Sequence, residues 1–108
     1  TVMQFDSSKR AVMNIKYNAD LIKVCKSLKF SLATFDRAKE PKKIRSLEGS
    51  SLEWGTAFSI RKCGFVPDII YDKGGMQKEE MIRVIADDIE SLVEKILKIH
   101  RRYLKALT

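Results

Sequence analysis

The sequence predicts a three-layer α/β domain with one mostly parallel β-sheet, in the element order β-α-β-α-β-β-α. Three observations lead to this prediction. Strand-like segments alternate with amphipathic helical segments, two connections carry helices long enough to be crossovers, and 108 residues suffice for one core. Helical crossovers require parallel strands on either side, whereas the short last connection allows an antiparallel final pair.

Four segments have the composition and the alternation of strands. The first, 11–17, places Val12 and Ile15 on opposite faces. The third is apolar on both faces, which is typical of a strand in the middle of a sheet. The predicted strands are residues 11–17, 30–35, 67–72 and 81–85.

Capping signals place the first two helices. Asn18 is suited to be the N-cap of a helix over residues 19–29. Ser50 and Glu53 have the spacing of a capping box at the start of the second helix, in which each side chain satisfies a backbone N–H of the other residue. Gly64 is a natural C-cap for that helix, because glycine adopts the left-handed conformation without strain.

A third helix closes the chain and begins after Asp87 or Asp88, either of which can cap it. Apolar residues recur there at helical spacing, which predicts one long amphipathic helix. Its predicted face consists of Ile89, Leu92, Val93, Ile96, Leu97, His100, Tyr103 and Leu104.

Cysteine and histidine usage argues against a structural metal and against a disulfide. Cys25 and Cys63 are far apart in the sequence, and His100 is the only histidine, so no zinc-ligand spacing exists. We therefore expect no metal ligand and two free thiols in a reducing compartment, the cytoplasm. No apolar run approaches the length of a membrane span, and the first ten residues do not form a secretion signal.

The net charge of +7 favours anionic partners, which are phosphorylated small molecules, nucleic acid or an acidic membrane surface. Much of the excess lies in residues 39–45 and 100–105, where no aromatic residues interleave as in a single-strand binding platform. Both runs also fit a solvated loop and a helix C-terminus. We expect phosphorylated small molecules as ligands rather than nucleic acid or membrane, and a homo-oligomer is left open.

Candidate ligand-binding residues lie after the predicted strands and at the second helix start, where α/β folds bind ligands. Ser50 and Ser51 offer hydroxyls and helix-start amides to a phosphate, or form an ordinary cap. Arg37 can clamp a phosphate or pair with a neighbouring carboxylate. Trp54 can stack on a planar ring or belong to the core.

The glycine-containing segment 73–78 lacks the spacing and the ending of a nucleotide-triphosphate loop, and it precedes a strand rather than a helix. Several carboxylates could supply a pair for Mg²⁺, whose diphosphate complexes need few protein ligands. These carboxylates are Asp36, Asp68, Asp72, Glu79 and Glu80.

Five ordered motifs together resemble one family. They are Arg10–Tyr17, Phe35–Arg37, Glu48–Gly55, Pro67–Asp72 and Lys78–Arg83. The chain resembles, over nearly its whole length, the ThiN-type thiamine-phosphate synthase domain, which is best known in archaea and is often fused behind a hydroxymethylpyrimidine (phosphate) kinase. The resemblance implies a transferase that joins hydroxymethylpyrimidine diphosphate to hydroxyethylthiazole phosphate with release of pyrophosphate. The alternative is a thiamine-phosphate-sensing domain of a transcriptional regulator, and a basic nucleic-acid-binding domain is a third reading.

The implied chemistry also suggests roles for individual residues. Departure of pyrophosphate leaves a pyrimidine-methyl cation that the thiazole nitrogen captures, so the site must neutralise phosphates and align two flat rings. Mg²⁺ is expected with the diphosphate substrate, and ATP only with a fused kinase domain. The expected roles are phosphate binding for Ser50, Ser51, Arg37 and Lys78, a ring contact for Asn14, stacking for Trp54, and a place near the metal or the aminopyrimidine for Asp72.

The chain departs from the family pattern in two places. Gln77 and Glu80 replace the glycine and the proline of a Gly-Lys-Glu-Pro element. An upstream stretch with an arginine and a Ser-x-His element, to which catalysis is attributed in the family, has no counterpart. We therefore expect residues 1–108 to be the C-terminal part of the domain in a longer multidomain chain. We also expect this part to fold but to be nearly inactive alone, with its catalytic residues unknown and upstream.

Overall fold

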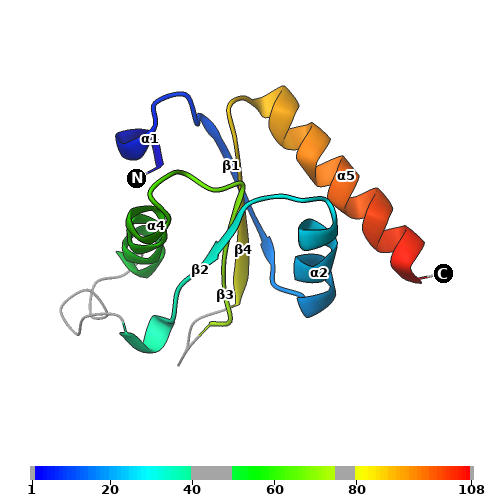
Figure 1. Ribbon diagram of the computed structural model, residues 1–108, viewed down its shortest axis with the longest axis horizontal. Helices are drawn as coiled ribbons and strands as arrows, with labels where there is room; N and C mark the ends of the chain where they lie inside the picture. Colours follow the sequence, from blue (N-terminus) through cyan, green and yellow to red (C-terminus); the bar gives the residue numbers. More distant parts are fainter. Residues whose placement is uncertain (1, 40–49, 75–79, 108) are drawn as a thin grey trace.

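A β-sheet lies between two helical layers in the computed structural model, which describes residues 2–39, 50–74 and 80–107, with only the backbone of residues 38 and 50–53 (Figure 1). The four strands and three helices expected from the sequence are present, and a short first helix and one 3₁₀ turn are added. The elements are α1 (Val2–Phe5), β1 (Ala11–Lys16), α2 (Ala19–Ser27), β2 (Leu32–Thr34), η1 (Arg37–Lys39), α4 (Ser50–Cys63), β3 (Ile69–Asp72), β4 (Met81–Ala86) and α5 (Ile89–Leu107).

The sheet is mixed and mostly antiparallel, with strand order β1-β4-β3-β2, so the prediction of a mostly parallel sheet was wrong. Strands β1, β2 and β3 do run in one direction, as their helical connections require. However, β4 follows β3 antiparallel and inserts between β3 and β1. Only the β2–β3 pair is therefore parallel, and the expected antiparallel final pair is confirmed.

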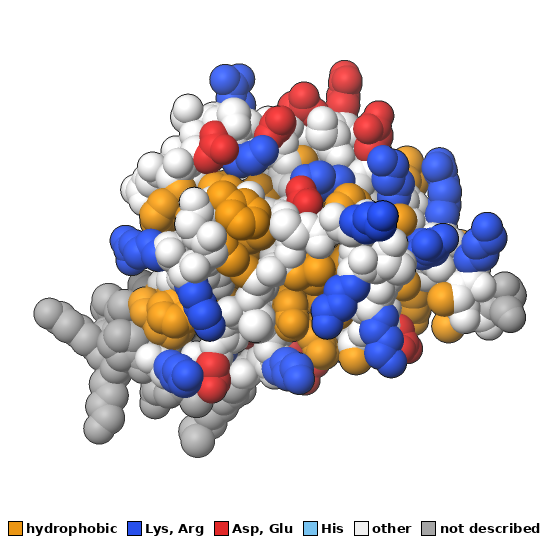
Figure 2. Space-filling view, viewed as in Figure 1, with side chains coloured by type: hydrophobic (Ala, Val, Ile, Leu, Met, Phe, Trp, Pro, Cys, Tyr) orange, Lys and Arg blue, Asp and Glu red, His pale blue; other side chains and the backbone are white. Residues whose placement is uncertain are grey.

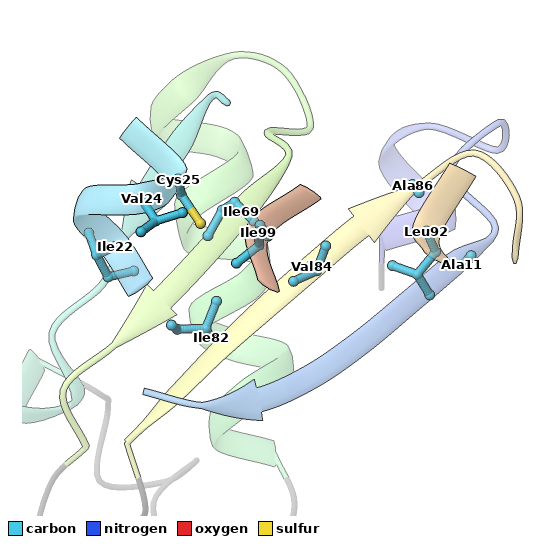
Figure 3. Packing of buried hydrophobic residues seen from close by; sticks show 10 residues of the cluster. All are labelled: Ala11, Ile22, Val24, Cys25, Ile69, Ile82, Val84, Ala86, Leu92 and Ile99. Atoms are coloured by element: carbon cyan, nitrogen blue, oxygen red, sulfur yellow. The ribbon is translucent and has the colours of Figure 1, made fainter. Parts of the chain in front are cut away.

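Two hydrophobic clusters cover the two faces of the sheet. One face packs against α2 and α5, and the other packs against α1 and α4, so the sheet is the middle layer of three (Figure 1). The larger cluster, between the sheet and α2 with α5, is drawn in Figure 3 and contains Ala11, Ile22, Val24, Cys25, Ile69, Ile82, Val84, Ala86, Leu92 and Ile99. The smaller cluster, on the α4 side, contains Val2, Phe35, Ile60, Ile70 and Ile85.

Three predicted caps are confirmed. The Asn18 side chain accepts a hydrogen bond from the Asp20 backbone N–H at 2.8 Å at the start of α2. Asp88 accepts from the Ser91 backbone N–H at 2.7 Å at the start of α5. Gly64, which follows α4, has φ +83°, the left-handed conformation that glycine tolerates best. The side chains of the predicted capping box of α4 lie outside the described residues.

Asp68, just before β3, ties the amino end of that strand to its surroundings. It accepts hydrogen bonds from Ser31 N–H and Oγ–H, and it forms an ion pair with Lys95 of α5 at 2.8 Å. Partial burial works to raise the pKa of the Asp68 carboxyl, but the bonds from Lys95 and Ser31 outweigh it and lower the pKa below its usual range. These contacts hold the start of β3 against the start of β2 and against α5.

Both cysteines are free thiols, as predicted. Cys25 is buried in the larger cluster, and burial raises the pKa of its thiol to about 11. Cys63 is half-buried at the end of α4.

Among the described helices, none is long and apolar enough to cross a bilayer. The described residues also contain no group of three or more His, Cys, Asp or Glu that could hold a metal ion.

Candidate functional site

A buried ion pair joins the ends of β2 and β3. Arg37 Nε donates to Asp72 Oδ2 at 2.6 Å, and Arg37 Nη2 lies 3.5 Å from Asp72 Oδ1. The side chains of Arg37 and Asp72 are 7% and 1% exposed, so both charges are removed from water. Such a pair needs good geometry to offset its desolvation, and the short Nε–Oδ2 contact provides it.

The parallel pairing of β2 with β3 explains why these two residues meet. Leu32 and Thr34 pair with Ile69 and Tyr71, so the carboxyl ends of both strands lie at the same edge of the sheet. Sequence reasoning placed Arg37 and Asp72 at strand ends, and the structure brings them into contact.

Neighbouring groups hold both partners of the ion pair in place. The Gly74 backbone N–H donates to Asp72 Oδ2 at 2.9 Å, from a residue with φ +78°. The Arg37 guanidinium also lies over the Phe35 ring, 5.7 Å from the ring centroid, a cation–π contact. One backbone N–H and one aromatic ring therefore fix the orientation of the pair.

A groove of about 470 Å³ opens beside this ion pair, between the second half of α4 and the ends of β2 and β3. We call it the strand-end groove. Its volume is in the range of small-molecule sites. It is lined by Thr34, Phe35, Asp36, Arg37, Lys39, Phe58, Lys62, Tyr71, Lys73 and Gly74.

The charges of the strand-end groove favour an anion. Arg37 and Asp72 neutralise each other, which leaves in the described lining three exposed lysines, Lys39, Lys62 and Lys73, against one carboxylate, Asp36. Figure 2 shows basic side chains around hydrophobic ones toward the lower end of the face that carries α4 and β2. Aromatic walls with a rim of lysines suit a flat ring that carries a phosphate.

A smaller hollow of about 320 Å³ continues from the groove along β2, and both share Thr34, Lys62 and Tyr71. It is also lined by Ser59 and Cys63 of α4. The Ser59 hydroxyl is buried and has no hydrogen-bond partner in the described part of the chain. A buried hydroxyl without a partner costs stability, and a ligand polar atom in the hollow would remove that cost.

Asn14 lies away from this groove, on the edge strand β1. Its Oδ1 accepts a hydrogen bond from Arg83 Nε at 3.1 Å, and Arg83 Nη1 donates to Thr56 Oγ1 of α4 at 2.9 Å. Asn14, Arg83 and Asp72 lie on the α4 side of three neighbouring strands. Sequence reasoning missed Arg83, although an arginine at a core-facing position of an alternating strand was a usable signal.

Trp54 forms part of an aromatic cluster behind the groove. Its ring lies edge-on to Phe35, with centroids 6.0 Å apart, and is stacked on Phe58 at 5.5 Å. Phe35 and Phe58 line the groove, so Trp54 supports its aromatic wall. Stacking of Trp54 on a ligand ring stays a prediction.

Three further predicted site residues have no described side chain. Ser50 and Ser51 form the first turn of α4, of which only the backbone is described. Lys78 lies outside the described residues. Their predicted phosphate-binding role is therefore neither supported nor opposed by the geometry.

A larger hollow, of about 510 Å³, lies between α2 and the C-terminal turns of α5. Leu107, Val24 and Tyr103 contribute much of its wall. It lies on the opposite side of the sheet from α4 and from the strand-end groove. The strand-end groove is the better candidate because buried, oriented polar groups adjoin it.

The fold and the groove define an α/β domain with a basic groove at the carboxyl ends of parallel strands. Comparison with known families identifies it further. The family model described as thiamine-phosphate synthase ThiN matches residues 1–98, so the chain belongs to this family. The resemblance drawn from the five motifs is confirmed.

Two curated relatives are similar over most of this chain. The bifunctional thiamine biosynthesis protein ThiDN of Methanocaldococcus jannaschii is 46% identical over 100 residues, which are 93% of this chain and 22% of that protein. The thiamine-phosphate synthase ThiN of Methanothermobacter thermautotrophicus is 34% identical over 95 residues, 88% of this chain and 50% of that protein. The chain therefore spans half or less of the length of these relatives.

Two crystal structures have the same fold. The C-terminal domain of protein MJ0236 superposes with a TM-score of 0.84 at 44% identity, over 97% of this chain and 55% of that chain. The C-terminal domain of phosphomethylpyrimidine kinase superposes with a TM-score of 0.80 at 31% identity, over 91% of this chain and 55% of that chain.

Proposed function

We propose that this chain holds the phosphorylated molecules of thiamine-phosphate synthesis in the strand-end groove. The reaction joins hydroxymethylpyrimidine diphosphate to hydroxyethylthiazole phosphate and releases pyrophosphate. The observation that carries the proposal is the lysine-rimmed, aromatic-walled groove beside the buried Arg37–Asp72 pair in a member of the ThiN family. Both curated relatives are named for thiamine biosynthesis, which favours synthesis over a sensing role.

The groove offers two kinds of contact, charged side chains for phosphate and aromatic side chains for a flat ring. Lys62 and Lys73 are exposed at the rim, where a flexible ammonium can reach a phosphate oxygen. Phe35 and Phe58 supply aromatic surface for a thiazole or pyrimidine ring. Arg37 is held by Asp72, so its role is to fix the groove wall.

Mg²⁺ fits the diphosphate substrate, because this ion commonly binds through one or two carboxylates together with substrate phosphates. Asp36 lines the groove and is the residue that would hold the ion there. Asp72 is engaged by Arg37 and Gly74 and does not serve as a ligand. When bound, Mg²⁺ neutralises charge on the departing pyrophosphate.

Catalysis at the full rate requires groups that the described lining of the groove does not supply. The only histidine, His100, lies on α5, which packs on the opposite face of the sheet from α4. No histidine of these 108 residues can therefore act as an acid or base at the groove. We propose that the catalytic arginine and histidine implied by the family resemblance act from sequence that these 108 residues do not contain.

An assay of pyrophosphate release tests the proposal that this chain binds the substrates while the catalytic groups lie outside it. With both substrates and Mg²⁺, we expect this chain to release pyrophosphate at less than about one-hundredth of the rate of the Methanothermobacter synthase, because positioned acid–base groups contribute about 10²–10⁴-fold. The relative is the matched reference in the same assay. Equal rates would refute this proposal and would place the catalytic groups among Asp36, Arg37, Asp72 and Lys78.

A further inference from the structure

Helix α5 carries two apolar stripes, and the protein core covers one of them. Leu92 and Ile99 are buried against the sheet, and Ile96 and Tyr103 pack partly against the same cluster. A second stripe remains exposed. It consists of Val93, Leu97, His100 and Leu104, and its three aliphatic members are between 42% and 49% exposed.

The exposed stripe has the spacing of a helix–helix contact. Its members follow one another at intervals of four, three and four residues, which is the heptad spacing of a coiled-coil seam. A helix that packs only on its own sheet does not need this second seam. The pattern therefore points to another helix as the occupant.

The stripe lies on the open side of α5. The other flank of α5 contacts α2, where Arg102 Nε donates to Ser27 Oγ at 3.3 Å. The stripe is on the flank away from α2, toward β1, which is an edge strand of the sheet. Met13 of β1, on the sheet face that α5 covers, is also 42% exposed. A second helix can approach α5 from this side.

Acidic residues lie at the start of α5 and basic residues in its second half, and this arrangement indicates which helix can pack against the stripe. Glu90 and Glu94 lie in its first turns, whereas Lys98, Arg101 and Lys105 follow in the second half. In Figure 2, acidic side chains gather where α5 begins, and basic side chains line the region of its C-terminal half. An antiparallel copy of the same helix would place basic residues opposite acidic ones, whereas a parallel copy would oppose like charges.

We propose that a second copy of this chain packs its α5 antiparallel against this stripe, related by a twofold axis. With the axis between Lys98 and Ile99, Leu97 of one copy faces His100 of the other, and Val93 faces Leu104. Glu94 and Arg101 lie along the same side of the stripe. Glu94 of each copy therefore faces Arg101 of the other copy, which gives two opposite-charge contacts across the axis. Neither forms an ion pair within the described part of its own chain.

Sedimentation equilibrium of the 108-residue protein tests this dimer. We expect dimers at about 0.1 mM, where complexes with micromolar dissociation constants are populated. Leu97→Glu should give a monomer at the same concentration, because it buries two carboxylates at the seam. A protein that stays monomeric at this concentration, or a dimer that tolerates Leu97→Glu, overturns the proposal.

A charge-swap cycle identifies the antiparallel register. Glu94→Arg alone and Arg101→Glu alone should each weaken the dimer by about fivefold to tenfold, because each variant opposes like charges twice. The double variant Glu94→Arg/Arg101→Glu should restore the original affinity. Lys98→Glu, on the solvent side of α5 away from the stripe, is the matched control and should have little effect. Failure of the double variant to recover affinity contradicts the proposed pairing.

Discussion

At the residue scale, burial decides how much an ion pair contributes to the free energy of unfolding. Two pairs have the same N–O distance of 2.6 Å, Arg37–Asp72 beside the groove and Lys9–Asp87 on the surface. The first pair is almost fully buried, whereas the Asp87 side chain is 59% exposed. Water screens the surface pair, but it cannot solvate Arg37 if its partner is lost. The two pairs therefore form a matched comparison.

Removing each carboxylate should separate these effects. We expect Asp72→Ala to lower the free energy of unfolding by about 3–5 kcal/mol, because it leaves a buried guanidinium unpaired. Asp87→Ala should cost less than about 1 kcal/mol. Urea unfolding followed by circular dichroism measures both. Similar losses for the two variants would mean that Arg37 finds water or another partner, and that the pair does not fix the groove wall.

At the element scale, α4 approaches the sheet closely at one glycine. A methyl group added at Gly55 would overlap the Phe35 ring, so glycine is required by packing rather than by its backbone conformation. Phe35 in turn contacts Trp54 and lines the strand-end groove. The position of α4 therefore sets the aromatic wall of the groove.

The variant Gly55→Ala tests this contact, because helix propensity and packing change its stability in opposite directions. Helix propensity alone would make alanine more stable by about 1 kcal/mol. Overpacking against the Phe35 ring should cost about 1–3 kcal/mol and outweigh that gain. We expect a net loss of stability in urea unfolding, which Phe35→Leu should reduce in the double variant. Stabilisation by Gly55→Ala would show that α4 lies farther from the sheet.

At the scale of the whole molecule, local signals predicted the elements but not the order of the strands. Asn18, Gly64 and Asp88 act through neighbouring backbone groups, so their caps could be predicted from adjacent residues. The insertion of β4 between β1 and β3 depends on long-range packing, which short segments do not encode.

The same distinction holds for the candidate site. The strand ends were enough to single out Arg37 and Asp72, which the parallel β2–β3 pair brings into contact. Lys62 and Ser59 were missed because they lie on α4, far from any strand end in the sequence. Only the packing of α4 on β2 brings them to the groove.

We propose above that the strand-end groove recognises a phosphorylated ligand. Isothermal titration calorimetry with thiamine phosphate and with thiamine, at one ionic strength, tests it most directly. We expect at least about tenfold tighter binding of thiamine phosphate, which corresponds to about 1.4 kcal/mol. Lys62→Ala and Lys73→Ala should each reduce that preference, whereas Lys98→Ala on α5 should not. Equal affinity for the two ligands, or an equal effect of Lys98→Ala, would contradict the claim.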